Sequence, residues 1–181
     1  MVLHLNLAAT ALPRTGCGAG FVPCIERILG ATVYTLTRPF LGAYFSGLYS
    51  QAEDKWRHLP QRFVDLVQDY YPEVDLSSVR YATGVKLRPG YTGLTYDRDV
   101  FFAGEMDFAN RSHLKRMLHE LTHVEQYASG VGGFLVSYVG QATIQLLRLG
   151  RLDVHDAIAM ERSADEKARV LMDEVFSALN S

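Results

Sequence analysis

Charged side chains are scarce at the front of this 181-residue chain. Among its 18 basic and 20 acidic residues, the first 51 positions hold only Arg14, Glu26, Arg27 and Arg38. A membrane span needs about 20 consecutive apolar residues. Here Arg38 and Pro39 divide the longest apolar stretch into residues 28–37 and 40–49. We therefore expect no transmembrane span, although the front of the chain is its most apolar part.

A positively charged start is also missing. No Lys or Arg precedes Arg14, and the polar residues His4 and Asn6 interrupt the first apolar stretch. A secretory signal begins with positive residues that are followed by an unbroken apolar segment. We expect no Sec signal. The protein is then expected to be synthesised in the cytoplasm, export by a specialised system is possible, and the final compartment stays open.

Cysteine is rare, and the net charge is small. The two cysteines, Cys17 and Cys24, are seven residues apart. Two ligands alone do not complete a zinc site, and this spacing is not that of a redox C-x-x-C pair. We interpret the two residues as reduced thiols or as a local bridge.

The net charge of −2 offers no general attraction for nucleic acid, so we expect no nucleic-acid partner.

The apolar patterning after the front segment is that of an α+β domain. We expect a small, mostly antiparallel sheet packed on one helix, with a C-terminal helix across it. The predicted helices cover residues 60–70, 113–128, 134–149 and 154–179, and the predicted strands lie within 79–85 and 94–103, with a turn at 97–99. Asn110 or Ser112 is the expected N-cap of the second helix.

That second helix carries the sequence HELTH over residues 119–123. Two histidines four residues apart lie on one helix face, so His119 and His123 can bind the same metal ion. Glu120 then projects to the side on which a metal-bound water would lie. Catalytic zinc usually has three protein ligands, so a third ligand is expected elsewhere in the chain. The alternative is an exposed helix face on which these residues are incidental.

Two carboxylates fall inside the apolar stripe of the last predicted helix, at Glu161 and Asp165. A buried, unpaired carboxylate costs several kcal/mol, so both need a cation or a strong hydrogen-bond donor. A zinc ion for Glu161 and an imidazole N–H for Asp165 would meet that need. The alternative is a helix turned by one residue, in which they pair in solvent with Arg162, Lys167 or Arg169.

Three further side chains are candidate oxyanion donors. They are Tyr127, Tyr138 and His155. Packing is the competing interpretation for the two tyrosines. For His155, as for His113, the competing interpretation is an ordinary surface or core histidine.

The sequence resembles a zincin-like family, long called a domain of unknown function, that is often encoded beside extracellular contractile injection systems and toxin proteins of bacteria. The resemblance covers about residues 59–175 and rests on HELTHVEQY over 119–127, Leu59-Pro60, Tyr71-Pro72, DLSSVR over 75–80 and VFF over 100–102. Glu161 and Asp165 are similar to the E-x-x-x-D element of gluzincin metallopeptidases. That similarity implies that Glu161 is the third zinc ligand and that Asp165 orients His119.

The leading hypothesis is a zinc metallopeptidase with a zincin-like fold that acts on a peptide or protein substrate. Zn²⁺ held by His119, His123 and Glu161 would activate a water molecule, and Glu120 would act as its general base. The strands within residues 94–103 would offer an edge to an extended peptide. Residues 52–181 would form this domain, with residues 1–51 as a low-charge apolar extension.

Two other hypotheses belong to different classes. One is a zinc-stabilised, non-catalytic interaction or cargo module of a bacterial secretion or injection system. It is motivated by the lack of an identified oxyanion donor and by the apolar front segment. The other is a membrane-active toxin component, which rests only on the low charge of residues 1–51.

Overall fold

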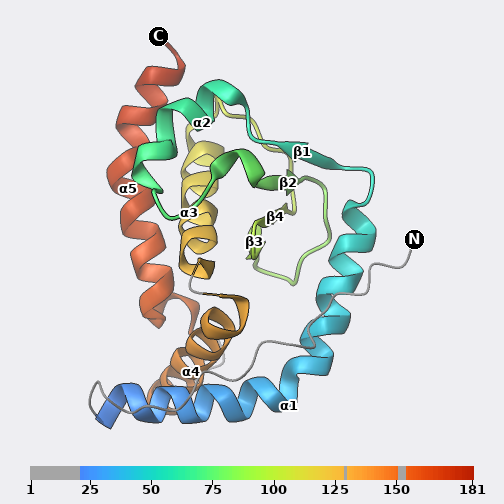
Figure 1. The fold of residues 1–181 in the computed structure, drawn as a ribbon, viewed down its shortest axis with the longest axis vertical. Coiled ribbons are helices and arrows are strands. Elements are labelled where there is room, and N and C mark those ends of the chain that lie inside the picture. Colours follow the sequence, from blue (N-terminus) through green and yellow to red (C-terminus); the bar gives the residue numbers. More distant parts are fainter. Residues whose placement is uncertain (1–20, 129, 151–153) are drawn as a thin grey trace. The chain divides into compact units, whose positions relative to one another are not determined.

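The fold is described from a computed structural model, which covers residues 21–128, 130–150 and 154–181 (Figure 1). The chain divides into two compact units. One comprises Met1–Ser46 and Ser129–Arg162, and the other comprises Gly47–Ala128 and Ser163–Ser181. The expected division into 1–51 and 52–181 stays a prediction.

The second unit contains a four-stranded sheet in the order β1-β2-β4-β3. Its strands are β1 (Trp56–His58), β2 (Arg80–Ala82), β3 (Gly93–Tyr96) and β4 (Asp99–Phe102). The outer pairs β1–β2 and β3–β4 are antiparallel, whereas the central pair β2–β4 is parallel. The α+β class is therefore confirmed, and the sheet is mixed.

A tight turn joins β3 to β4. Tyr96 pairs with Asp99, so only two residues connect the strands. Asp97 has a φ of 57°, in the left-handed region, which aspartate tolerates better than most residues. The turn predicted at 97–99 is thus confirmed, and β3 becomes an edge strand of the sheet.

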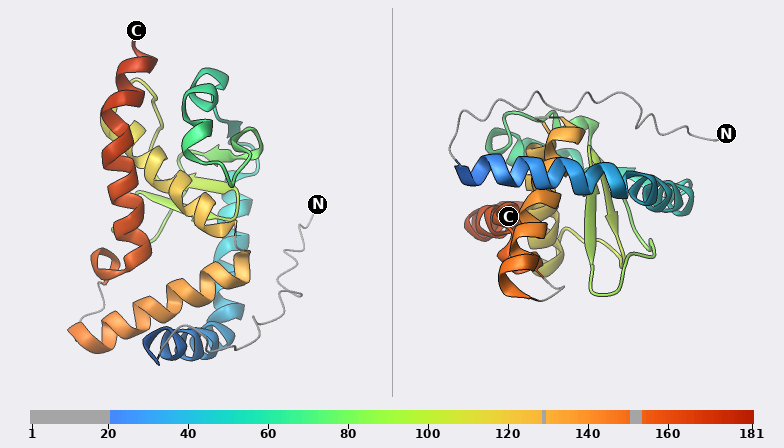
Figure 2. Two further views of the ribbon diagram at one scale, coloured as in Figure 1. Left: turned by 60° about the vertical axis from the view of Figure 1, so that its left-hand side comes forward. Right: turned by 90° about the horizontal axis from the view of Figure 1, so that it is seen from below.

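Helix α3 (Arg111–Tyr127) begins at the cap expected from the sequence. The side chain of Asn110 accepts hydrogen bonds from the backbone N–H groups of Ser112 and His113, as an N-cap residue does. α3 lies beside β3, and the left-hand view of Figure 2 shows this helix in yellow next to the green strands. Its apolar face joins the core of the unit, which includes Leu114, Met117, Leu118, Leu121 and Val124.

Two further helical segments complete this core. The short helix α2 (Gln61–Val67) continues into the 3₁₀ turn η1 (Gln68–Tyr70), and a second turn, η2 (Leu76–Ser78), follows. The predicted helix at 60–70 is confirmed. Tyr71, which is completely buried, donates a hydrogen bond of 2.9 Å from its hydroxyl to the carbonyl oxygen of Leu118 on α3.

The last helix is shorter than predicted. α5 spans Ala159–Leu179, and the 3₁₀ turn η3 (His155–Ala157) precedes it. Ile158 has an extended backbone, with φ −72° and ψ 128°, which interrupts the α-helical hydrogen-bond ladder. Val154 and Ile158 are both buried in this arrangement, so the apolar spacing predicted a helix where the chain instead makes a tighter turn.

The first unit contains most of α1 (Phe21–Ala52) and all of α4 (Val131–Leu149). Pro39 lies inside α1, where a proline removes a backbone hydrogen bond and kinks a helix, and Figure 1 shows α1 bent along its length. A Cβ at Gly30 would lie 2.0 Å from the carbonyl oxygen of Val136. The backbones of α1 and α4 therefore touch at this glycine.

The helix predicted over 134–149 as buried is exposed at its end, because Leu147 is 73% and Leu149 is 45% accessible. Apolar composition does not distinguish a buried helix from an exposed one.

Cys24 lies on α1 and carries no free thiol, whereas Cys17 lies outside the described residues.

Among the described residues, no single helix has both the length and the apolar composition of a membrane span. Only α3 and α4, counted together as a bent pair, reach that length and composition.

An acidic and aromatic cluster ties the end of α1 to the sheet. Asp99 on β4 accepts a 2.7 Å hydrogen bond from the hydroxyl of Tyr49 and two bonds, of 2.9 and 3.0 Å, from the guanidinium of Arg80. That guanidinium also lies 4.6 Å from the centroid of the Trp56 ring. Burial and the bond to Asp99 raise the pKa of Tyr49 well above its usual value.

We expect Asp99→Ala to lower the free energy of unfolding by about 1.5–3 kcal/mol, because it leaves the Tyr49 hydroxyl and the Arg80 guanidinium without their acceptor. Urea unfolding followed by circular dichroism measures this change. Asp54→Ala is the matched control, because Asp54 is exposed, and we expect a change within about 0.5 kcal/mol. Equal losses in the two variants would contradict the assignment.

Candidate metal centre

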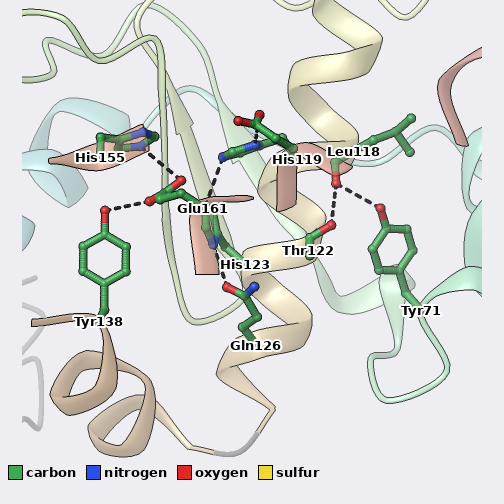
Figure 3. Close-up of polar contacts among 10 residues, drawn as sticks. Tyr71, Leu118, His119, Thr122, His123, Gln126, Tyr138, His155 and Glu161 are labelled. Carbon is green, nitrogen blue, oxygen red and sulfur yellow. Dashed lines mark hydrogen bonds and ion pairs between the residues drawn. The ribbon is translucent and has the colours of Figure 1, made fainter. Parts of the chain in front are cut away.

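The two histidines of the HELTH sequence face each other on α3. The Nε2 atoms of His119 and His123 are 3.1 Å apart (Figure 3). Their spacing of four residues brings the rings to successive turns of one helix face. His123 is 6% accessible and the side chain of His119 is 15% accessible. The interpretation of this motif as an exposed helix face is therefore wrong.

The other ring nitrogens lie beside oxygen acceptors. His119 Nδ1 lies 3.0 Å from Asp165 Oδ1, and His123 Nδ1 lies 2.9 Å from Gln126 Oε1. A neutral imidazole carries one ring proton. In the tautomer in which each Nδ1 donates to its oxygen, each Nε2 offers its lone pair to a metal ion.

This geometry fits a metal ion. Two nitrogens bound at about 2.0–2.1 Å to a tetrahedral zinc ion lie roughly 3.3 Å apart, close to the 3.1 Å between the two Nε2 atoms. Without a cation or a proton, two such lone pairs repel each other. Metal-bound histidines also usually donate their other ring N–H to a carboxylate or carbonyl group, as both do here.

Glu161 completes a three-residue cluster. Ligand atoms of His119, His123 and Glu161 all lie within 4.8 Å of one another, so the cluster could hold a metal ion. Glu161 is carried by α5, the continuous helix that also carries Asp165 one turn later. Its side chain is 4% accessible. The predicted ligand set is thus brought together, although the identity of the metal is not given by the geometry.

Asp165 differs from the sequence prediction. Its side chain is 65% accessible, so it does not lie within the buried stripe of α5. That stripe includes its neighbours Ala164 and Ala168, and Asp165 falls just outside it. Asp165 nevertheless reaches His119, the predicted partner. The prediction of burial was wrong, whereas the contact occurs as expected.

Glu120 is held against the edge strand. It is 5% accessible, and its Oε2 accepts a 2.7 Å hydrogen bond from the hydroxyl of Thr95 on β3. A Cβ at Gly93 would lie 2.2 Å from Glu120 Oε1. A side chain at position 93 would force this carboxylate to move, so glycine allows Glu120 to lie directly against β3.

The three candidate oxyanion donors occupy different places. Tyr127 is buried, with its ring 6.1 Å from that of Tyr96 and its hydroxyl 3.4 Å from the carbonyl oxygen of Thr95. Tyr138 and His155 both contact Glu161 (Figure 3). Their role as oxyanion donors stays a prediction.

Sequence reasoning missed two residues of this site. Gln126 lies three residues after His123, on the same helix face, so the spacing could have identified it. Thr95 is 25 residues from Glu120, and no local pattern links them. Their contact depends on the packing of helix α3 against strand β3, which local sequence patterns do not specify.

A pair of facing histidines and a nearby carboxylate on an α+β frame define a candidate metal-binding protein. Residues 59–131 match the family model of the eCIS core domain. The resemblance to the family associated with extracellular contractile injection systems is thereby confirmed for this part of the chain. The match includes HELTH and ends before Glu161 and Asp165. Searches among curated proteins and among solved structures find no match.

We expect protein purified without chelator to contain about one equivalent of zinc, because a three-ligand site should survive purification. His123→Ala should contain less than about a tenth of an equivalent, since it removes one ligand. Elemental analysis by mass spectrometry measures both. His58→Ala is the control, because His58 is exposed on β1. A parent protein with less than about half an equivalent would contradict the metal site.

Proposed function

We propose that this protein is a zinc-dependent peptide hydrolase whose ion is held by His119, His123 and Glu161. The observation that carries the proposal is the facing pair of Nε2 atoms, 3.1 Å apart, with each Nδ1 beside an oxygen that can accept its hydrogen bond. Soft cations that prefer thiolates are disfavoured by this set, whereas two imidazoles and a carboxylate are a common catalytic zinc set.

When bound, zinc would lower the pKa of a water molecule and polarise a substrate carbonyl group. The protein would supply the rest. Glu120 would accept a proton from the attacking water and pass it to the leaving amine. Asp165 and Gln126 would keep the two imidazoles in the tautomer that leaves Nε2 free of protons.

The substrate would lie along β3. This strand is at the end of the sheet order, so one side of its backbone can pair with an extended peptide. Glu120 lies directly against β3, through Gly93 and Thr95. A peptide added to this edge would therefore run close to the proposed general base.

A second candidate is a zinc-stabilised module that has no catalytic activity. It is supported by the contacts of Glu120, because a general base must be free to exchange protons. The Thr95 hydroxyl already occupies Oε2 of this buried carboxylate. Such a module would serve as cargo or as a binding partner in an injection system, a context that the eCIS core domain match favours.

Glu120→Gln separates the two candidates. We expect the variant to keep zinc, because Glu120 is not in the ligand cluster, and to lose cleavage by at least 100-fold, because an amide cannot act as a base. Zinc content and hydrolysis of an unfolded, fluorescently labelled protein measure the two effects. Glu125→Gln is the matched control, since Glu125 is also on α3 but pairs with Lys167.

The outcomes differ for each candidate. Loss of zinc in Glu120→Gln, or full activity, would contradict the role of Glu120. A parent protein that binds zinc but cleaves neither itself nor an unfolded substrate would support the non-catalytic module.

A further inference from the structure

Glu161 makes two contacts that do not involve the histidine pair. The hydroxyl of Tyr138 on α4 donates a 2.6 Å hydrogen bond to Oε1, and Nε2 of His155 on η3 lies 3.1 Å from Oε2 (Figure 3). The three residues belong to the same compact unit. Each oxygen of the carboxylate therefore has a different partner.

The two partners differ in strength and in exposure. A distance of 2.6 Å is typical of a charge-assisted O–H···O⁻ bond, which is about twice as strong as a neutral one. The contact of His155 is longer, and the side chain of His155 is 41% accessible, so water can replace it. Oε1 is thus the firmly held oxygen, and Oε2 is the one whose partner can be exchanged.

A carboxylate that binds a metal through one oxygen still needs a partner for the other. A donor on that other oxygen fixes the orientation of the carboxylate, and such outer partners change metal affinity by about 10- to 100-fold. A donor on the metal-binding oxygen has the opposite effect, because the metal has to displace it. The two kinds of donor can therefore be told apart by the sign of their effect on affinity.

We propose that Tyr138 is a positioning residue that holds Oε1 of Glu161 while a metal ion takes Oε2 in place of His155. The inference rests on the proposed metal site. It makes Tyr138 and His155 the partners of the third ligand, Glu161, and it predicts that the two residues have opposite effects on metal affinity.

The experiment compares zinc affinity in the full-length parent protein, Tyr138→Phe and His155→Ala at one pH, by competition with a chromophoric chelator. We expect Tyr138→Phe to bind zinc about 10- to 100-fold more weakly. We expect His155→Ala to bind zinc as tightly as the parent protein, or up to about tenfold more tightly, because it removes a competitor. The visible spectrum of the cobalt-substituted proteins reports the ligand geometry, and we expect it to change in Tyr138→Phe.

Tyr44→Phe is the matched control, because it makes the same change on α1, where the Tyr44 ring packs against Phe45. Its affinity and cobalt spectrum should equal those of the parent protein. Circular dichroism checks that each variant is folded, and Tyr138→Leu, which also lacks a hydrogen-bond donor, replaces Tyr138→Phe if the latter does not fold.

Each result decides between the alternatives. A parent protein that binds zinc, with Tyr138→Phe unchanged or His155→Ala weakened tenfold or more, would overturn this inference and leave the proposed function standing. A parent protein that does not bind zinc would overturn both.

Discussion

The site depends on the close approach of two imidazole nitrogens on one face of α3. Nδ1 of His119 lies beside Asp165, Nδ1 of His123 lies beside Gln126, and the two Nε2 atoms are 3.1 Å apart. In the tautomer in which each Nδ1 donates to its oxygen, both Nε2 lone pairs can bind one metal ion. Binding of a metal ion would then stabilise this part of α3.

The surrounding structure maintains that arrangement from two sides. The apolar face of α3 is part of the core, so the helix cannot rotate its two histidines away from this position without exposing side chains such as Leu118 and Leu121. On the other side, Gly93 and Thr95 of β3 receive the buried carboxylate of Glu120. The helix that supplies the histidines is thus fixed against the strand on which we place the substrate.

Local patterns predicted the site better than they predicted its surroundings. The histidine spacing and the cap at Asn110 both depend on residues within one or two helical turns, and both occur in the structure. The course of α1 through Pro39, the late start of α5 and the exposure of Asp165 depend on tertiary packing, which apolar spacing does not encode. Thr95 could not be predicted because its contact with Glu120 depends on the packing of β3 against α3.

X-ray absorption at the zinc edge tests the central claim most directly. We predict that the purified parent protein binds zinc through two imidazole nitrogens and through oxygen at about 2.0–2.1 Å, and that His123→Ala, which loses its zinc, gives almost no protein-bound signal. Sulfur at about 2.3 Å, which would point to cysteine, or a shell of oxygen without imidazole would contradict it.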